Sequence, residues 1–233
     1  MALDPAHRRI YDRQLNRERQ RVLKLVEDLD RNRFEILRSL TVLRQLCLDV
    51  SLVDAGYAGK ARSAKIDALV EQLVELAEEG HRALVFSQFT RFLALVRARL
   101  EAEGIGYTYL DGRTRDRARR VAAFTQGTDP VFLISLKAGG VGLTLTEADY
   151  VFVLDPWWNP ATEAQAIDRA HRIGQDKTVM VYRLVASDTI EEKVLALQAR
   201  KRDLFTRVVD GGAMSEAALS AADIRALFEP ASR

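Results

Sequence analysis

The stretch VFLISLKAGGVGLTLTEADYVFVLD, residues 131–155, contains two short apolar runs separated by a glycine-rich loop. Residues 131–135 and 150–155 are apolar at nearly every position, without the period-two alternation of a half-exposed strand. Continuous apolar runs of this length are typical of strands that are covered on both faces. We therefore predict two buried strands of one parallel sheet.

The neighbouring sequence repeats this pattern in both directions. Three more apolar runs, at residues 83–89, 107–111 and 179–185, are predicted strands, and residues 90–103 and 114–124 are predicted helices. Alternation of strands and helices favours an α/β fold with a parallel sheet and helices on both faces. In such sheets, ligands bind in the loops that follow the carboxyl ends of the strands.

Helical patterns flank the predicted sheet. Residues 5–48 read as helix, and Ser63 is expected to begin an amphipathic helix that ends at Gly80 in a left-handed conformation. A closing helix is expected from Asp188, with Glu191 as its capping partner, to about residue 209, and a short one at 222–227. The expected division is a helical segment at 1–62 and an α/β lobe at 63–233.

The composition excludes several classes of protein. The chain has 233 residues, a formal net charge of +2, one cysteine and three histidines. One cysteine allows no disulfide framework or thiolate metal site, and the dispersed histidines suggest no zinc site, so no metal site is expected. Neither a membrane-spanning run nor a signal-peptide pattern is found, so a cytoplasmic protein with no membrane partner is expected.

The helix predicted after Asn159 carries a stripe of cationic and amide side chains. Gln165, Arg169 and Arg172 follow one another at spacings of four and three residues, which places them on one side of a helix. The planar guanidinium group is always charged and matches phosphate oxygens. A solvated surface helix, with Asp168 paired to Arg172, is the alternative interpretation of the same residues.

The glycine-rich loop is a second candidate phosphate site. Gly140 and Gly142 allow close approach of a ligand to the backbone, and Lys137 adds a charge. A tight turn without a ligand is the alternative. The pattern G-x-x-x-x-G-K-[ST] occurs nowhere in the chain, so this loop is not a P-loop.

A third feature, DGRTRDRARR at residues 111–120, contains five arginines. Thr114 is expected to cap the helix that begins there. Such a cluster can contact a nucleic-acid backbone, although a solvated helix face has the same composition.

Together these motifs resemble the second motor lobe of Swi/Snf-type DNA translocases, which belong to helicase superfamily two. VFSQF, YLDGRT, FLISLKAGGVGLTLTEADYVFVLDPWWNP and QAIDRAHRIGQ occur in the order and spacing of that family. The last two are the most specific. The resemblance covers nearly the whole chain and implies a RecA-like lobe.

The resemblance also implies roles for individual residues. Arg169, Arg172 and Gln165 match the motif whose arginines reach the ATP phosphates. Nucleotide contact is implied for Gly140, Gly142 and Thr144, the last replacing the Asn of many relatives. Backbone contacts to double-stranded DNA are implied for Ser87, Gln88, Gly112, Thr114, Ser135 and Lys137.

The family places the lysine of the phosphate loop and the acidic magnesium box in a first lobe, and this chain has neither. The resemblance therefore implies an ATPase whose ATP and Mg²⁺ are held mainly by that first lobe, and an isolated chain that is inactive. Two alternatives remain: a non-catalytic nucleic-acid-binding or protein-interaction module, and a small-molecule enzyme on an α/β sheet.

Overall fold

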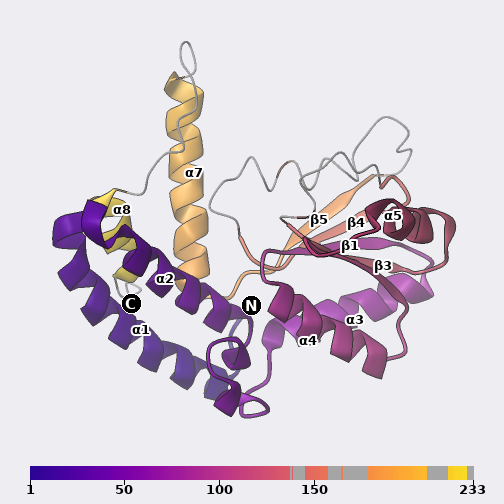
Figure 1. Ribbon diagram of the computed structural model, residues 1–233, viewed down its shortest axis with the longest axis horizontal. Coiled ribbons are helices and arrows are strands. Elements are labelled where there is room, and N and C mark those ends of the chain that lie inside the picture. Colours follow the sequence, from indigo (N-terminus) through magenta and orange to yellow (C-terminus); the bar gives the residue numbers. More distant parts are fainter. Residues whose placement is uncertain (137, 139–144, 157–163, 165–177, 209–219, 230–233) are drawn as a thin grey trace. The chain divides into compact units, whose positions relative to one another are not determined.

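The computed structural model describes residues 1–136, 138, 145–156, 164, 178–208 and 220–229, and of residues 201–208 only the backbone (Figure 1). The chain divides into two compact units. One contains Met1 and Ser63–Val185, and the other contains Ala2–Arg62 and Ala186–Arg233. The division expected from the sequence, at 1–62 and 63–233, instead places residues 186–233 with the α/β lobe.

The first unit is built on a parallel sheet, which confirms the predicted fold class. Within the described residues it has five strands in the order β2-β3-β1-β4-β5. The strands are β1 Ala83–Ser87, β2 Tyr107–Leu110, β3 Val131–Ser135, β4 Tyr150–Val153 and β5 Met180–Arg183. Every neighbouring pair is parallel, and Ser87 at the end of β1 lies opposite Ser135 at the end of β3.

Helices cover both faces of this sheet. Figure 1 shows α3 (Ala64–Glu78) and α4 (Thr90–Ala102) on one side and α5 (Arg117–Gln126) on the other. Alternate residues of the strands, such as Phe86 and Phe132, share a buried cluster with Phe124 of α5. Each fully buried side chain of this size contributes about 1.5–3 kcal/mol by leaving water.

The ends of α3 agree with the sequence prediction. The Ser63 hydroxyl accepts a hydrogen bond from the Ile66 N–H group, which satisfies one free donor of the first turn. Gly80, after the last turn, has a φ of 77°, which glycine adopts without steric cost. The cap predicted for the next arginine-rich helix was wrong: Asp116, and not Thr114, accepts the Arg119 N–H at the start of α5.

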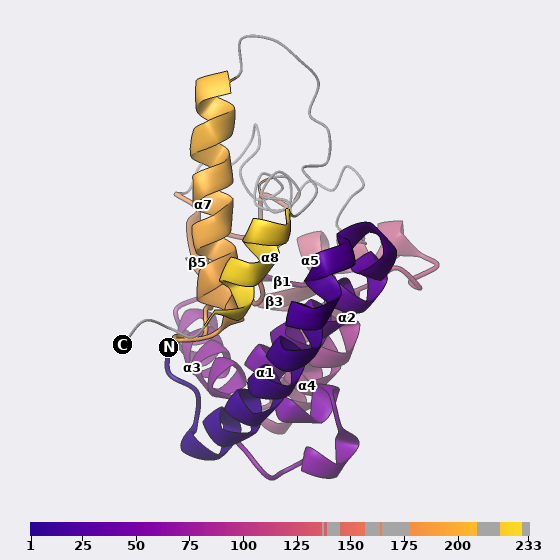
Figure 2. The same cartoon turned by 90° about the vertical axis from the view of Figure 1, so that its left-hand side faces the viewer.

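The second unit is helical. It contains α1 (Pro5–Leu25), α2 (Leu29–Leu48), α7 (Ile190–Val208) and α8 (Ala221–Phe228), and Figure 2 shows α8 lying against α7. Short 3₁₀ turns at Val26–Asp28, Val50–Leu52 and Ala55–Tyr57 complete its described part. The single helix predicted at 5–48 was wrong, because the chain turns at Val26–Asp28 and the two helices pack against each other.

Contacts between the N-terminal helix and the start of α7 hold this unit together. The Ile190 N–H donates to the Tyr11 hydroxyl at 2.7 Å, and the Arg8 guanidinium donates to the Ser187 carbonyl oxygen at 2.6 Å. Burial raises the pKa of the Tyr11 phenol. Tyr11, about 180 residues earlier in the chain, therefore satisfies a free N–H group in the first turn of α7.

The predicted capping box of α7 was also wrong. The helix begins at Ile190, after Thr189, whose hydroxyl accepts the Glu191 N–H at 3.2 Å. The Glu191 carboxylate instead accepts the Ala186 N–H at 2.9 Å. Asp188 has a left-handed φ of 56°, and its N–H donates to Glu192.

Among all described helices, none has the length and apolar character that crossing a membrane requires.

Candidate functional site

The carboxyl ends of the strands place two predicted site residues, Ser87 and Ser135, and two aspartates along one edge of the sheet. Ser87 ends β1, Ser135 ends β3, Asp111 follows β2 and Asp155 lies two residues after β4. Because all these strands are parallel, their carboxyl ends meet at the same edge. The loops singled out in the sequence therefore begin side by side.

A buried carboxylate connects two of these strand ends. The Ser87 hydroxyl donates to Asp155 Oδ1 at 2.5 Å, and the Gln88 N–H lies 3.3 Å from both carboxylate oxygens. The Ser87 hydroxyl in turn accepts the Phe89 N–H at 3.0 Å. Both Ser87 and Asp155 have no exposed surface. The Ser87 hydroxyl is thus engaged inside the protein, and it fixes the conformation of the loop after β1.

A buried lysine forms a hydrogen bond with the backbone at the same edge of the sheet. Lys65 of α3 is 1% exposed, and its ammonium group donates to the Leu154 carbonyl oxygen at 2.6 Å. Neither Lys65 nor Asp155 is among the site residues predicted from the sequence. The signals were a lysine next to the apolar face of an amphipathic helix and an acid that ends an apolar strand run. Such residues are seldom buried unless they have partners.

Ser135 stands where the glycine-rich loop begins. It is 2% exposed, and its hydroxyl accepts the Ala138 N–H at 3.4 Å. The hydrogen bond holds the first residues of the loop against the end of β3. Lys137, Gly140, Gly142 and Thr144, the other residues predicted in this loop, lie outside the described residues.

The loop after β2 is closed by hydrogen bonds that the Asp111 carboxylate accepts. Its carboxylate accepts the Arg113 N–H at 2.9 Å and the hydroxyls of Thr114 and Tyr109 at 3.1 Å. Burial opposes ionisation of Asp111, but these hydrogen bonds outweigh it and lower its pKa. Burial, with the hydrogen bond to Asp111, raises the pKa of Tyr109 to about 12. Gly112 is exposed at the tip of the turn, where its backbone faces solvent.

The arginine cluster that follows this loop forms a cationic surface. Arg113, Arg115, Arg119 and Arg120 are exposed, and Arg117 is half-buried. None of the five forms an ion pair with another residue that the structure describes. Their donors are therefore available to an external anion, as contact with a phosphate backbone requires.

Comparison with known proteins identifies the class of this lobe. Residues 64–174 match the model of the helicase conserved C-terminal domain. The Sulfolobus solfataricus SWI2/SNF2 ATPase C-terminal domain has a similar fold, with a TM-score of 0.70 and 27% identity over 99% of this chain and 96% of that one. The chain therefore matches the C-terminal domain of SWI2/SNF2 ATPases in sequence and in structure.

Other relatives extend the comparison. The S. solfataricus SWI2/SNF2 ATPase core in complex with dsDNA gives a TM-score of 0.75 and 27% identity, over 99% of this chain and 49% of that one. DNA repair protein rad8 of Schizosaccharomyces pombe is 43% identical over 178 residues, 74% of this chain and 16% of rad8.

An uncharacterized ATP-dependent helicase of Mycoplasma pneumoniae is 39% identical over 211 residues, 89% of this chain and 20% of the helicase. The SWI2/SNF2 lobe thus spans a fifth or less of these two curated relatives.

The remaining predicted residues of the SWI2/SNF2 lobe lie on the segment after Pro156. Gln165, Arg169 and Arg172 fall within the matched range 64–174 but outside the described residues. Their roles stay predictions.

Among the residues that the structure does describe, no group of three or more His, Cys, Asp or Glu side chains could hold a metal ion.

Proposed function

We propose that this lobe is the second half of an ATP-dependent motor that moves along double-stranded DNA. The observation that carries the proposal is the clustering of the motif loops at one edge of the sheet, inside the range that matches the helicase C-terminal domain. The dsDNA complex of the S. solfataricus SWI2/SNF2 core supports the choice of duplex DNA as partner.

ATP would contact this lobe through the residues that the family motifs indicate. Arg169 and Arg172 provide guanidinium groups for the phosphates, with Gln165 on the same helical stripe, and Gly140 and Gly142 provide backbone N–H groups. Preorganised cations stabilise the charge that develops on a transferring phosphoryl group. The Ser135 hydroxyl, which binds the Ala138 N–H, holds the start of the glycine-rich loop at the sheet edge where this chemistry is expected.

The first lobe of the same protein would hold the nucleotide and Mg²⁺. Metal and nucleotide chemistry therefore belongs to the interface of two lobes, and this chain's part is to supply arginines and to bind DNA. Such residues contribute mainly by positioning the reacting phosphate and stabilising its charge, and not by covalent chemistry.

DNA binding would use the loops after β1, β2 and β3. Gly112 and the exposed arginines after it present open donors, whereas the hydroxyls of Ser87 and Ser135 are held inside the protein. We infer that the two serines act on DNA indirectly, by fixing the conformation of the loops that they begin, and do not themselves donate to the phosphates. Contacts to phosphates carry little sequence information, so we expect weak sequence preference.

Steady-state ATPase assays test this function. The isolated chain should hydrolyse ATP negligibly with or without duplex DNA, because the phosphate loop and metal carboxylates are absent from it. The same chain joined to its first lobe should show ATPase activity that duplex DNA stimulates. Robust turnover by the purified isolated chain, or a two-lobe protein indifferent to DNA, would contradict the proposal.

A further inference from the structure

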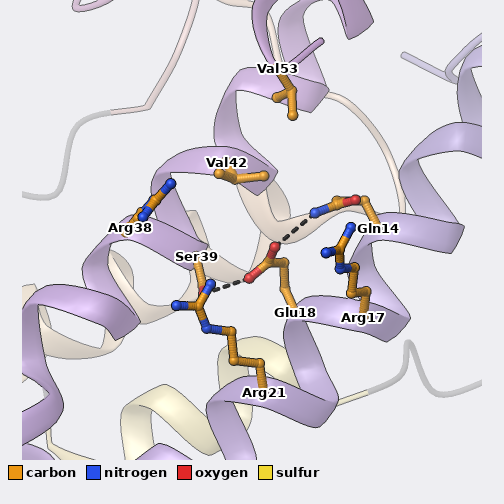
Figure 3. A pocket seen from close by; sticks show the side chains of 8 residues that line it. All are labelled: Gln14, Arg17, Glu18, Arg21, Arg38, Ser39, Val42 and Val53. Carbon is orange, nitrogen blue, oxygen red and sulfur yellow. Dashed lines mark hydrogen bonds between the residues drawn. The ribbon is translucent and has the colours of Figure 1, made fainter.

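A groove in the helical unit has no role in the proposed motor chemistry. It lies between α1 and α2, has a volume of about 530 Å³, and we call it the hairpin groove. Its walls include Arg17, Glu18 and Arg21 of α1 and Arg38, Ser39 and Val42 of α2 (Figure 3). All these residues belong to one compact unit, distant in sequence from every motif described above.

The floor of the groove is a carboxylate whose hydrogen bonds are satisfied internally. Glu18 is 6% exposed and accepts hydrogen bonds from the Gln14 amide at 2.7 Å and the Ser39 hydroxyl at 2.6 Å. Figure 3 shows both bonds converging on Glu18. Because both carboxylate oxygens already have donors, the floor is a fixed polar surface and does not require a bound cation.

The walls of the groove carry guanidinium groups with free donors. Figure 3 shows Arg38 and Arg17 on opposite sides of Glu18. Both are exposed, and neither forms an ion pair with any residue in the described part of the chain. Arg21 differs, since it pairs with Glu35 at 2.7 Å. Two open guanidinium groups can each bind a carboxylate or a phosphate in a bidentate manner.

An exposed aromatic side chain decides between these anions. Phe34 is 87% exposed, and it precedes Arg38 by four residues, as Arg38 precedes Val42. Residues four apart share a face of a helix, so an apolar group continues the line of the groove wall. Leu37 beside it is also 36% exposed. A DNA backbone offers phosphates but no apolar side chain to cover Phe34. An acidic peptide can offer both carboxylates for the arginines and an apolar side chain for Phe34.

We propose that the hairpin groove is a docking site for an acidic segment of a partner protein that also carries apolar side chains. Carboxylates of the segment bind Arg17 and Arg38, and an apolar side chain covers Phe34. Along α1, the stretch from Gln14 to Arg21 is about 10 Å long, room for about three residues of an extended chain. Charge complementarity and the exposed Phe34 together favour this occupant.

Fluorescence anisotropy with a labelled peptide of alternating glutamate and leucine tests the proposal on the whole chain. The Arg17→Glu and Arg38→Glu variants should each weaken peptide binding at least about tenfold, the loss expected for a charge-assisted pair. Phe34→Ala should weaken it severalfold. The matched control is Arg33→Glu, which makes the same charge change at an exposed position of α2 outside the groove.

Three outcomes would overturn the proposal. The first is no measurable binding of the peptide by the folded chain. The second is an equal loss in the Arg33→Glu control, which would mean nonspecific attraction. The third is displacement of the peptide by duplex DNA or inorganic phosphate as effectively as by unlabelled peptide, which would make the groove an anion or DNA site. Because Arg17, Phe34 and Arg38 are exposed, thermal melting of all variants should match the wild type.

Discussion

The Ser87 hydroxyl donates a hydrogen bond to the Asp155 carboxylate at 2.5 Å, and this bond joins the end of β1 to the residues after β4. Both residues are fully buried, so the hydrogen bond lies in a water-poor environment. Asp155 also receives the Gln88 N–H, and it is followed by the loop that leads to the predicted arginine stripe. The pair therefore couples the geometry of two motif loops.

Removing this hydroxyl should destabilise the lobe. Ser87→Ala leaves one carboxylate oxygen without its hydroxyl donor and should lower the free energy of unfolding by about 1.5–3 kcal/mol. Urea unfolding of the chain measures this change. Thr41→Ala, which removes an exposed hydroxyl from α2, is the control and should change stability by about half a kcal/mol or less. Equal effects of the two substitutions would mean that the Ser87–Asp155 bond contributes little.

Tyr109 should make stability depend on pH in the alkaline range. Burial, followed by its hydrogen bond to Asp111, raises the folded-state pKa from 10.0 to about 12. Below pH 10 both states keep the proton and the contribution is complete; between pH 10 and about 12 the unfolded chain ionises first, so stability falls.

The Tyr109→Phe variant tests this directly. Since it has no phenol to ionise, its free energy of unfolding should fall less steeply than that of the wild type as pH rises through this window. Denaturant unfolding at several alkaline pH values gives both curves. Parallel curves for the two proteins would contradict the raised pKa.

The arginine cluster after β2 should determine how DNA binding depends on salt. Each phosphate contact contributes about 0.9 to the slope of log affinity against log salt concentration. Arg119→Ala and Arg120→Ala, which change exposed side chains without described ion pairs, should each reduce that slope if the arginine contacts DNA.

Arg31→Ala on α2 is the control and should leave the slope unchanged. The measurement is a titration of duplex binding at several salt concentrations, with two unrelated DNA sequences. A slope that none of the variants changes, or strong preference for one sequence, would count against backbone contact by this cluster.

The sheet was predictable because its local signals and its tertiary environment agree. Strands covered on both faces must be apolar throughout, and the runs at residues 83–89, 131–135 and 150–155 have that pattern before any folding is considered. Strand β1 ends two residues earlier than its predicted run at 83–89, because the chain turns toward the following helix after Ser87, whereas β3 ends where its run does, at Ser135. Element boundaries depend on such turns and less on composition.

The helical unit was less predictable because its decisive contacts are far apart in the sequence. No Pro or Gly marks the turn at Val26–Asp28. The Asp28 carboxylate caps α2 by accepting the Arg31 N–H, and packing of α1 against α2 accompanies the turn. The bond between Tyr11 and the Ile190 N–H joins residues that no local pattern relates. Likewise, Asp155 and Lys65 read locally as a strand end and a helix residue, and their burial becomes visible only in three dimensions.

The arginine stripe carries the central claim, that this lobe supplies arginines to ATP held by a first lobe. The most direct test is the steady-state ATPase rate of the two-lobe protein at saturating DNA, for Arg169→Ala and Arg172→Ala, alongside DNA affinity and thermal melting. Loss of such an arginine can lower turnover by about a thousandfold or more, and lysine should rescue poorly because it lacks the planar fork. We predict this loss with nearly unchanged DNA affinity and melting temperature. Normal turnover in both alanine variants would contradict the claim, as would a collapse of the melting temperature, which would assign the two arginines to holding the helix in place.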